Sequence, residues 1–267
     1  EKFSSFVSEY DNIRINLVIM SLIIIGGLGF IVWDDISKNK LNFKKYMLHT
    51  KIVLSTTIIL IFVSAALFYV FENPNLYVDM SMKGKILASL FSAVTPRTAG
   101  FNTLDTAALT SSSKLLTIVL MFVEGSPGST AGGVKTTTAA IAIYYVLNSI
   151  SGKSECNIFK RRVSDAIVKK ACVIICVNLM LCIIGTITIC HLQSSAPISD
   201  VLFEVTSAIG TVGMSTGITR ELTSLSRLII ALLMYCGRIG SLTFVFVFTE
   251  NKAIAPISMP EEKVSIG

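Results

Sequence analysis

The sequence predicts an all-α polytopic membrane protein made of repeated helix–pore loop–helix modules, and three observations lead to this fold class. Apolar residues make up 52% of the 267 residues and charged residues only 15%, whereas about 25% charged is usual for a soluble domain. Several apolar segments reach the roughly 20 helical residues that cross the hydrocarbon core of a bilayer. A short apolar segment, a Thr-x-Gly turn and a long apolar helix occur twice, in the same order.

Five apolar segments are long enough to span the bilayer, and they cover approximately residues 13–33, 51–71, 115–147, 168–190 and 225–248. Two shorter segments, residues 85–94 and 200–208, cannot cross it, and each of them precedes one Thr-x-Gly turn. We therefore expect these two to be pore half-helices, which enter the membrane and leave it again on one face.

The basic residues indicate how the spans are oriented. They gather in the loop between the first two spans and in the loop between the third and fourth: Lys38, Lys40, Lys44, Lys45 and Lys51 in the former, and Lys153, Lys160, Arg161, Arg162, Lys169 and Lys170 in the latter. The positive-inside rule places both loops in the cytoplasm, so the N-terminus and the two turns face outward and the C-terminus faces inward. The net charge of +6 follows from these loops. It fits a multi-pass protein of the cell membrane in contact with lipid headgroups, and not nucleic-acid binding.

The two turns align without a gap at an offset of 113 residues, and the match continues from Leu109-Thr110-Ser111 to Leu222-Thr223-Ser224. Irregular backbone at membrane depth persists only where it lines water or is buried in protein, and rings of backbone carbonyls replace the hydration shell of an ion in potassium channels. The pattern therefore predicts a cation filter. Its predicted residues are Thr98, Ala99, Gly100, Phe101, Thr211, Val212, Gly213 and Met214, with K⁺ held at Thr98, Gly100, Thr211 and Gly213.

Of the Thr-Val-Gly-Tyr-Gly filter of potassium channels, only Thr211-Val212-Gly213 remains in one copy, and the other copy has Thr98-Ala99-Gly100. Fewer aligned carbonyl layers predict weaker selectivity than a five-residue filter provides. Glycine allows the backbone angles that such a turn needs. A single Thr-x-Gly would equally fit helix packing in a membrane; two copies in register after half-helices favour the filter.

The third span contains a segment that cannot stay helical. Residues 125–133 include four glycines and one proline, which cost about 1 and about 3 kcal/mol each in a helix interior. We expect an intramembrane loop across the pore below the filter; a kinked helix packed through small residues is the alternative. The residues concerned are Gly125, Ser126, Pro127, Gly128, Ser129, Thr130, Ala131, Gly132 and Gly133, with Glu124 before them.

Arg238 lies near the middle of the fifth span. A mid-membrane arginine costs at least about 2.5 kcal/mol, so it should face a cavity or a partner. We expect its guanidinium to bind carbonyls of the broken segment or Glu124 and to place a positive barrier under the filter; a purely structural ion pair is the alternative. For Arg97, Asp105, Lys114 and Glu204, which flank the turns, the expectation is a solvated outer rim.

The first span is expected to be the closing helix of an earlier module, because residues 23–29 align with residues 234–240 and their glycines match. The predicted domains are residues 1–50 (this helix and a cytoplasmic loop), 51–165 (a module with the broken closing helix) and 166–267 (a further module and the C-terminal tail). A cation filter needs four loops and two are present here, so either a longer chain supplies the other two or two chains pair. The first helix, which has no module before it, favours the longer chain. The sequence given is therefore predicted to be the C-terminal part of a larger polypeptide.

Four segments resemble those of the Trk/Ktr/HKT potassium transporters, most of all the bacterial Ktr membrane subunits. Residues 92–103 (SAVTPRTAGFNT) and 207–217 (SAIGTVGMSTG) resemble the third and fourth filter segments of that family. Residues 125–137 (GSPGSTAGGVKTT) resemble the break in its third closing helix, and residues 236–240 (CGRIG) its arginine-bearing final helix. Glu124 departs from the family pattern, in which a glycine is expected.

The resemblance implies a gating role for residues 125–133, four pore modules in the parent chain, a homodimer, and a cytoplasmic nucleotide-binding regulatory ring of the RCK type. The predicted function is that of the pore-forming subunit of a potassium uptake transporter, with sodium stimulation or symport left open; a passive potassium or monovalent cation channel is the alternative. No organic cofactor is predicted for this chain, since it lacks a P-loop. A membrane-embedded enzyme is disfavoured, because the spans lack paired aspartates or a Ser–His pair; short loops disfavour a receptor or scaffold.

Overall fold

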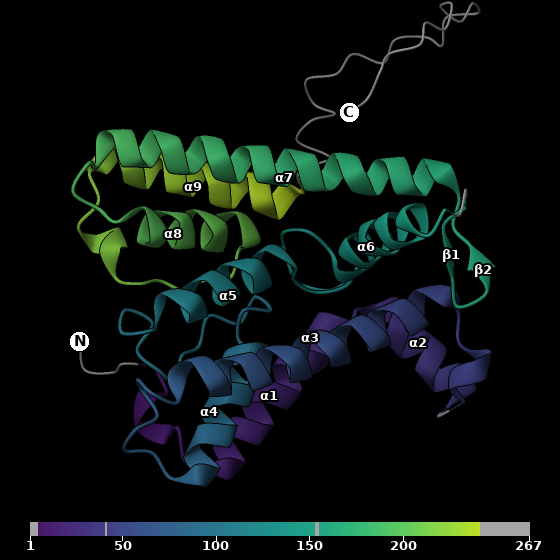
Figure 1. Cartoon of the computed structure of the whole chain (residues 1–267), viewed down its shortest axis with the longest axis horizontal. Helices are drawn as coiled ribbons and strands as arrows, with labels where there is room; N and C mark the ends of the chain where they lie inside the picture. The colour runs from purple at the N-terminus through teal and green to yellow at the C-terminus, as the bar shows by residue number, and fades with distance from the viewer. Residues whose placement is uncertain (1–4, 41, 153–154, 241–267) are drawn as a thin grey trace, which may run out of the picture.

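The computed structural model describes residues 5–40, 42–152 and 155–240. Its elements are helices joined by loops, with one hairpin whose strands, β1 and β2, have two residues each (Figure 1). In chain order they are η1 (Val7–Glu9), α1 (Ile13–Leu28), α2 (Phe30–Asn39), η2 (Phe43–Lys45), α3 (Leu48–Glu72), α4 (Met82–Val94), α5 (Ser111–Phe122), α6 (Thr136–Ile150), β1 (Asn157–Ile158), β2 (Arg161–Arg162), α7 (Asp165–Leu192), α8 (Ile198–Gly210), η3 (Ile218–Arg220) and α9 (Ser224–Ile239).

The opening helices of the two complete modules are the longest. Helix α3 has 25 residues and α7 has 28, and both are apolar enough to cross a membrane. They confirm the spans predicted at 51–71 and 168–190. Large side chains on their outer faces, such as Phe62 of α3 and Ile187 of α7, are 64% and 65% exposed. Apolar surface of this extent fits contact with lipid.

The first predicted span, residues 13–33, is bent into two helices. Helix α1 ends at Leu28, and α2 leaves it at 95°. The bend occurs at Gly29, whose φ of +81° suits glycine, and whose missing β-carbon would lie 2.6 Å from the carbonyl oxygen of Pro127. Helix α9 ends in the same way at the matching Gly240, with φ +92°. The rest of the span predicted to reach residue 248 lies outside the described residues.

The third closing helix is broken as predicted. Helix α5 ends at Phe122, α6 begins at Thr136, and residues 123–135 between them form the crossing segment. The two half-helices are present too: α4 and α8 have 13 residues each, α8 ends directly before Thr211, and α4 ends four residues before Thr98. In both modules a threonine, Thr110 or Thr223, caps the closing helix by accepting the backbone NH of the serine three residues later.

The modules pack side by side, and the long helices α3 and α7 run in roughly the same direction (Figure 1). Helix α4 packs on α3, and α8 packs on α7, α9 and α5, so that α5 joins the two modules. The buried core of the second module brings together Cys182 of α7, Val205 of α8 and Leu233 of α9. The two basic loops lie at the same end, where the rings of Phe43 and Phe159 are 6.1 Å apart. The start of the described chain lies at the opposite end (Figure 1).

Candidate ion filter and gate

Each half-helix ends in a turn of unusual backbone conformation. Residues 98–101, the first filter turn, follow α4, and residues 211–214, the second filter turn, follow α8. Thr98 and Gly100 have φ of +62° and +74°, and the matching Thr211 and Gly213 have +57° and +87°. The left-handed region is costly for a threonine, and two threonines in the same place show that the turn geometry repeats with the sequence.

The two filter turns meet. A β-carbon on Gly100 would lie 2.8 Å from the carbonyl oxygen of Val212 and 3.2 Å from that of Gly213. A side chain at Gly100 would therefore displace the backbone of the second turn. Residues that are 113 positions apart in sequence thus face each other, as a filter built from several loops requires.

The carbonyl groups of the two turns divide into two classes. Within the residues that the structure describes, no hydrogen bond is formed to the carbonyl oxygens of residues 98–100 or 211–213. The next carbonyl in each turn is bonded from behind: Thr95 Oγ1 donates to Phe101 O at 2.5 Å, and Ser207 Oγ donates to Met214 O at 2.6 Å. Three carbonyls in each turn are thus left for another partner, and the fourth is held by its own half-helix.

The C-terminal ends of α4 and α8 point at these turns, and the C-terminal end of a helix carries partial negative charge. Free carbonyl oxygens next to two such ends form an environment that favours a cation. At membrane depth there is no solvent to satisfy the oxygens unless they line a water-filled or ion-filled path.

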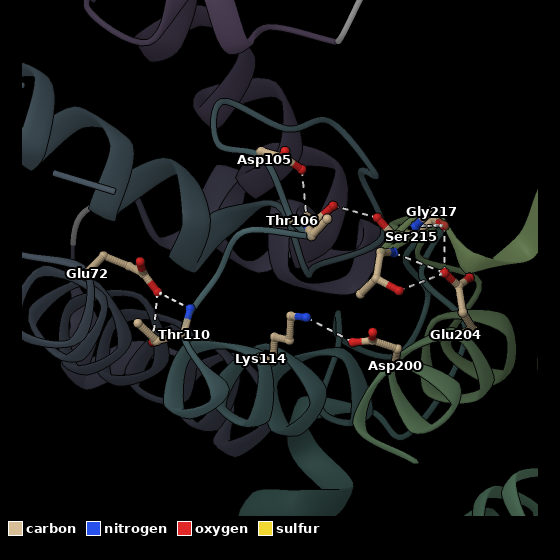
Figure 2. Close-up of polar contacts among 11 residues, drawn as sticks. Glu72, Asp105, Thr106, Thr110, Lys114, Asp200, Glu204, Ser215 and Gly217 are labelled. Carbon is tan, nitrogen blue, oxygen red and sulfur yellow. Dashed lines mark hydrogen bonds and ion pairs between the residues drawn. The ribbon is translucent and has the colours of Figure 1, made fainter. Parts of the chain in front are cut away.

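Each filter turn is followed by a loop that leads to the closing helix: residues 102–110 and residues 215–223, here called the post-filter loops. Polar side chains connect these loops to the helices (Figure 2). Thr106 Oγ1 donates to the carbonyl oxygen of Ser215, at 2.5 Å, which joins the loops of the two modules. Glu204 of α8 accepts hydrogen bonds from the segment that contains Ser215. Lys114 of α5 and Asp200 of α8 form an ion pair at 2.9 Å.

Two of the four residues expected at a solvated rim are buried, and for them that expectation is wrong. Arg97 is 5% exposed, and its Nη2 donates to Thr57 Oγ1 of α3 at 3.2 Å. Glu204 is 6% exposed and lies behind the second filter turn. Both are close to the turns in sequence, but whether a side chain beside a turn faces water or protein depends on the packing of the other helices. The exposed Asp105 does fit the rim.

The crossing segment is anchored to the bend between α1 and α2. Ser126 donates through its backbone NH and its Oγ to the carbonyl oxygen of Gly27, at 2.9 and 3.0 Å. The backbone NH of Phe30 donates to the carbonyl oxygen of Gly128, at 3.3 Å. Gly27 and Phe30 lie on either side of the bend, so its freed backbone groups are satisfied by residues of the crossing segment, as intramembrane breaks require.

The other end of the crossing segment lies against the base of the second filter turn. A β-carbon on Gly132 would lie 2.5 Å from Thr211 Oγ1. The carboxylate of Glu124, which is 0% exposed, fills the space that β-carbons on Gly133 and Gly210 would occupy. Lys135 binds the segment itself, with Nζ donating to the carbonyl oxygen of Gly132 at 2.9 Å.

Arg238 of α9 provides a third contact with the crossing segment. Its Nη1 donates to the carbonyl oxygen of Thr130 at 2.7 Å. The expectation that Arg238 binds a loop carbonyl is confirmed, and its hydrogen-bond partner among the described residues is Thr130 and not Glu124. The crossing segment is therefore held by α1 and α2, by the base of the second filter turn and by α9.

Comparisons with known proteins agree with this architecture. The family model described as TrkH, cation transport protein, matches residues 2–255. The Ktr system potassium uptake protein B of Bacillus subtilis is 38% identical over 265 residues, which are 98% of this chain and 59% of the relative. The potassium/sodium uptake protein NtpJ of Enterococcus hirae is 36% identical over 269 residues, with the same two shares.

Among solved structures, the crystal structure of the potassium transporter TrkH from Vibrio parahaemolyticus is similar, with a TM-score of 0.71 and 16% sequence identity. The match covers 92% of this chain and 53% of that one. It confirms the predicted fold class of repeated helix–pore loop–helix modules. The chain spans 59% of the length of the curated relatives named above.

Proposed function

This chain belongs to the TrkH family of cation transport proteins, and from that premise we propose that it is the C-terminal part of the pore-forming subunit of a potassium uptake transporter. The supporting observation is the set of free carbonyl oxygens in residues 98–100 and 211–213, where two touching turns follow two half-helices. A dehydrated monovalent cation is the partner that such oxygens take in a membrane.

In this proposal K⁺ enters from the outer face, and the carbonyls of the two filter turns replace part of its hydration shell. The partial negative charge at the ends of α4 and α8 stabilises the ion there. The membrane potential drives the ion inward, at about 2.3 kcal/mol per charge and 100 mV. Below the filter, the crossing segment and Arg238 act as the gate: the loop narrows the path, and the guanidinium repels a cation.

The remaining organisation is part of the same proposal. Residues 1–50 hold the closing helix of a preceding module, residues 51–165 the third module and residues 166–267 the fourth, so that four filter turns surround one pore in a longer chain. The full-length protein forms a homodimer on a cytoplasmic nucleotide-binding ring. The basic loops face the cytoplasm and the N-terminus of this chain faces outward. The protein performs transport and no enzymatic reaction, and its nucleotide-binding sites lie in the partner ring.

A glycine substitution in the filter tests the function. The full-length protein is expressed in a bacterium that lacks its own potassium uptake systems, and growth in low potassium and Rb⁺ uptake are measured. Gly100→Ala should lower uptake at least tenfold, because its β-carbon would meet the carbonyl of Val212 and its φ is positive. Gly152→Ala is the matched control, since Gly152 also has positive φ, +70°, but lies in open space. Full uptake by Gly100→Ala would contradict the proposed filter.

Measurements of K⁺ flux test whether sodium stimulates transport. The name of the Enterococcus hirae relative includes both potassium and sodium. In vesicles that contain the purified protein, K⁺ uptake is measured at fixed membrane potential with and without an inward sodium gradient. A rise with sodium identifies sodium-stimulated or coupled transport, and no change excludes both and leaves the potential-driven transporter and the passive potassium or monovalent cation channel.

A further inference from the structure

We propose that Glu204 is a positioning residue that sets the ion preference of the second filter turn, an inference that rests on the proposed filter. Glu204 lies in the middle of α8, is 6% exposed, and faces the chain that leaves the filter (Figure 2). It does not reach the filter carbonyls through any hydrogen bond in the described part of the chain. Its effect is on the backbone that carries them.

Both carboxylate oxygens of Glu204 bind this backbone or its side chains. Oε1 accepts from Ser215 Oγ at 2.6 Å, from the Thr216 backbone NH at 3.0 Å and from Thr216 Oγ1 at 3.4 Å. Oε2 accepts from Thr219 Oγ1 at 2.7 Å. Hydrogen bonds to an ionised carboxylate are shorter and stronger than those between neutral groups. One buried side chain therefore fixes the segment from Ser215 to Thr219.

Ser207 extends this support to the filter itself. It lies three residues after Glu204 on α8, so the two side chains share a helix face. Ser207 Oγ binds the carbonyl oxygen of Met214, and Glu204 binds Ser215 and Thr216. Met214, Ser215 and Thr216 are thus all held by side chains of α8. They directly follow Gly213, which carries the last free carbonyl of the second filter turn. A small rotation of the Ser215–Thr216 peptide would be transmitted to the Gly213 carbonyl.

The two filter turns differ in this support. The residue that matches Glu204 in the first module, 113 positions earlier, is Phe91, which is 1% exposed and packs in an apolar cluster with Met20 and Val94. The Thr95 hydroxyl binds the fourth carbonyl of the first turn as the Ser207 hydroxyl binds that of the second, but α4 contains no Asp or Glu that could play the part of Glu204. Thr106 of the first module instead donates to Ser215 O, so both post-filter loops depend on the residue that Glu204 holds (Figure 2).

Carbonyl ligands that are held in place distinguish K⁺ from the smaller Na⁺ by their number, field strength and spacing. Ligands that move distinguish the two ions less well. Glu204→Gln keeps the size of the side chain but places an amide NH₂ where one of two acceptor oxygens now binds. In the full-length protein, the ratio of K⁺ to Na⁺ uptake should fall at least fivefold, while the amount of protein in the membrane stays the same.

Asp200→Asn is the matched control. Asp200 is one turn before Glu204 on α8 and pairs with Lys114, so the variant removes a negative charge from the same helix without touching the filter segment. Its K⁺ to Na⁺ ratio should stay unchanged. If Glu204→Gln lowers K⁺ and Na⁺ uptake equally, or if Asp200→Asn shifts the ratio as much, the positioning role is excluded.

Ser215→Ala provides a second measurement, which decides the matter if Glu204→Gln does not reach the membrane. It removes one hydroxyl from Oε1 and leaves the carboxylate in place, so the ratio should fall in the same direction by a smaller factor. An unchanged ratio in Ser215→Ala overturns the inference. The proposed filter is tested separately by Gly100→Ala: if that variant has full uptake, the filter itself is wrong, whereas a loss there with an unchanged ratio in Glu204→Gln refutes only the role of Glu204.

Discussion

Gly132 lies directly against Thr211, so that a β-carbon on Gly132 would be 2.5 Å from Thr211 Oγ1 and 2.8 Å from the carbonyl oxygen of Gly210. This contact joins the crossing segment to the base of the second filter turn. The two parts of the proposed pore, filter and gate, therefore cannot move independently at this point. A single substitution at Gly132 can test whether this contact matters for transport.

Gly132→Ala should lower K⁺ uptake at least tenfold, because the new methyl group forces either the crossing segment or Thr211 to shift. Overpacking of this kind costs about 1–3 kcal/mol. Gly26→Ala is the control, since Gly26 lies in the neighbouring α1 with no atom within 4 Å of its β-carbon position. Rb⁺ uptake of both variants, normalised to protein in the membrane, is the measurement. Equal uptake in the two would show that the contact does not matter for transport.

Arg238→Gln should raise ion flux through the protein. The variant removes the positive charge below the filter and weakens the charge-assisted hydrogen bond to Thr130 O, a bond that contributes about 1.5–3 kcal/mol. Arg238→Lys keeps the charge and should remain near the parent flux. The check is K⁺ efflux from vesicles at fixed potential. Unchanged flux in folded Arg238→Gln protein would exclude the barrier role.

Glu124 and Gly210 should be energetically coupled. The Glu124 carboxylate occupies the position that a β-carbon on Gly210 would take, so Gly210→Ala alone should be destabilising. In the Glu124→Ala background the same substitution should cost less, with a coupling energy of about 1 kcal/mol or more for residues in contact. The double-mutant cycle is measured by unfolding in detergent. Additive effects would show that the carboxylate does not fill this space.

Glu72 should matter for stability and not for ion preference. Its Oε1 accepts the backbone NH and the hydroxyl of Thr110, both at 2.9 Å, and so connects the end of α3 to the cap of α5 (Figure 2). Loss of a buried carboxylate that accepts such bonds costs about 1.5–3 kcal/mol, which Glu72→Ala should show as a lower melting temperature.

Gln193 is the counterpart of Glu72 in the second module, and its Oε1 accepts the Thr223 backbone NH at 3.1 Å. As a neutral and more exposed residue, it should lose less stability on change to alanine. A shift in the K⁺ to Na⁺ ratio in Glu72→Ala, without loss of stability, would contradict this assignment.

The parts of the fold that follow from local chemistry were predictable from the sequence. Uninterrupted apolar stretches became α3 and α7, and the glycines and proline of residues 125–133 ended the third closing helix. The repeated Thr-x-Gly turns took the same left-handed angles at Thr98 and Thr211. Each of these depends on residues within a few positions of one another, and so a repeat in sequence becomes a repeat in conformation.

The parts that depend on which helices meet were not predictable. Gly29 bends the first span because the carbonyl of Pro127 approaches it, from a segment almost a hundred residues away. Arg97 and Glu204 are buried because α1, α3 and the post-filter loops close around them. Which carbonyls stay free was decided by the hydroxyls of Thr95 and Ser207. Spacing along the chain sets the conformation of a turn, whereas the direction and environment of its side chains are set by partners that only folding brings near.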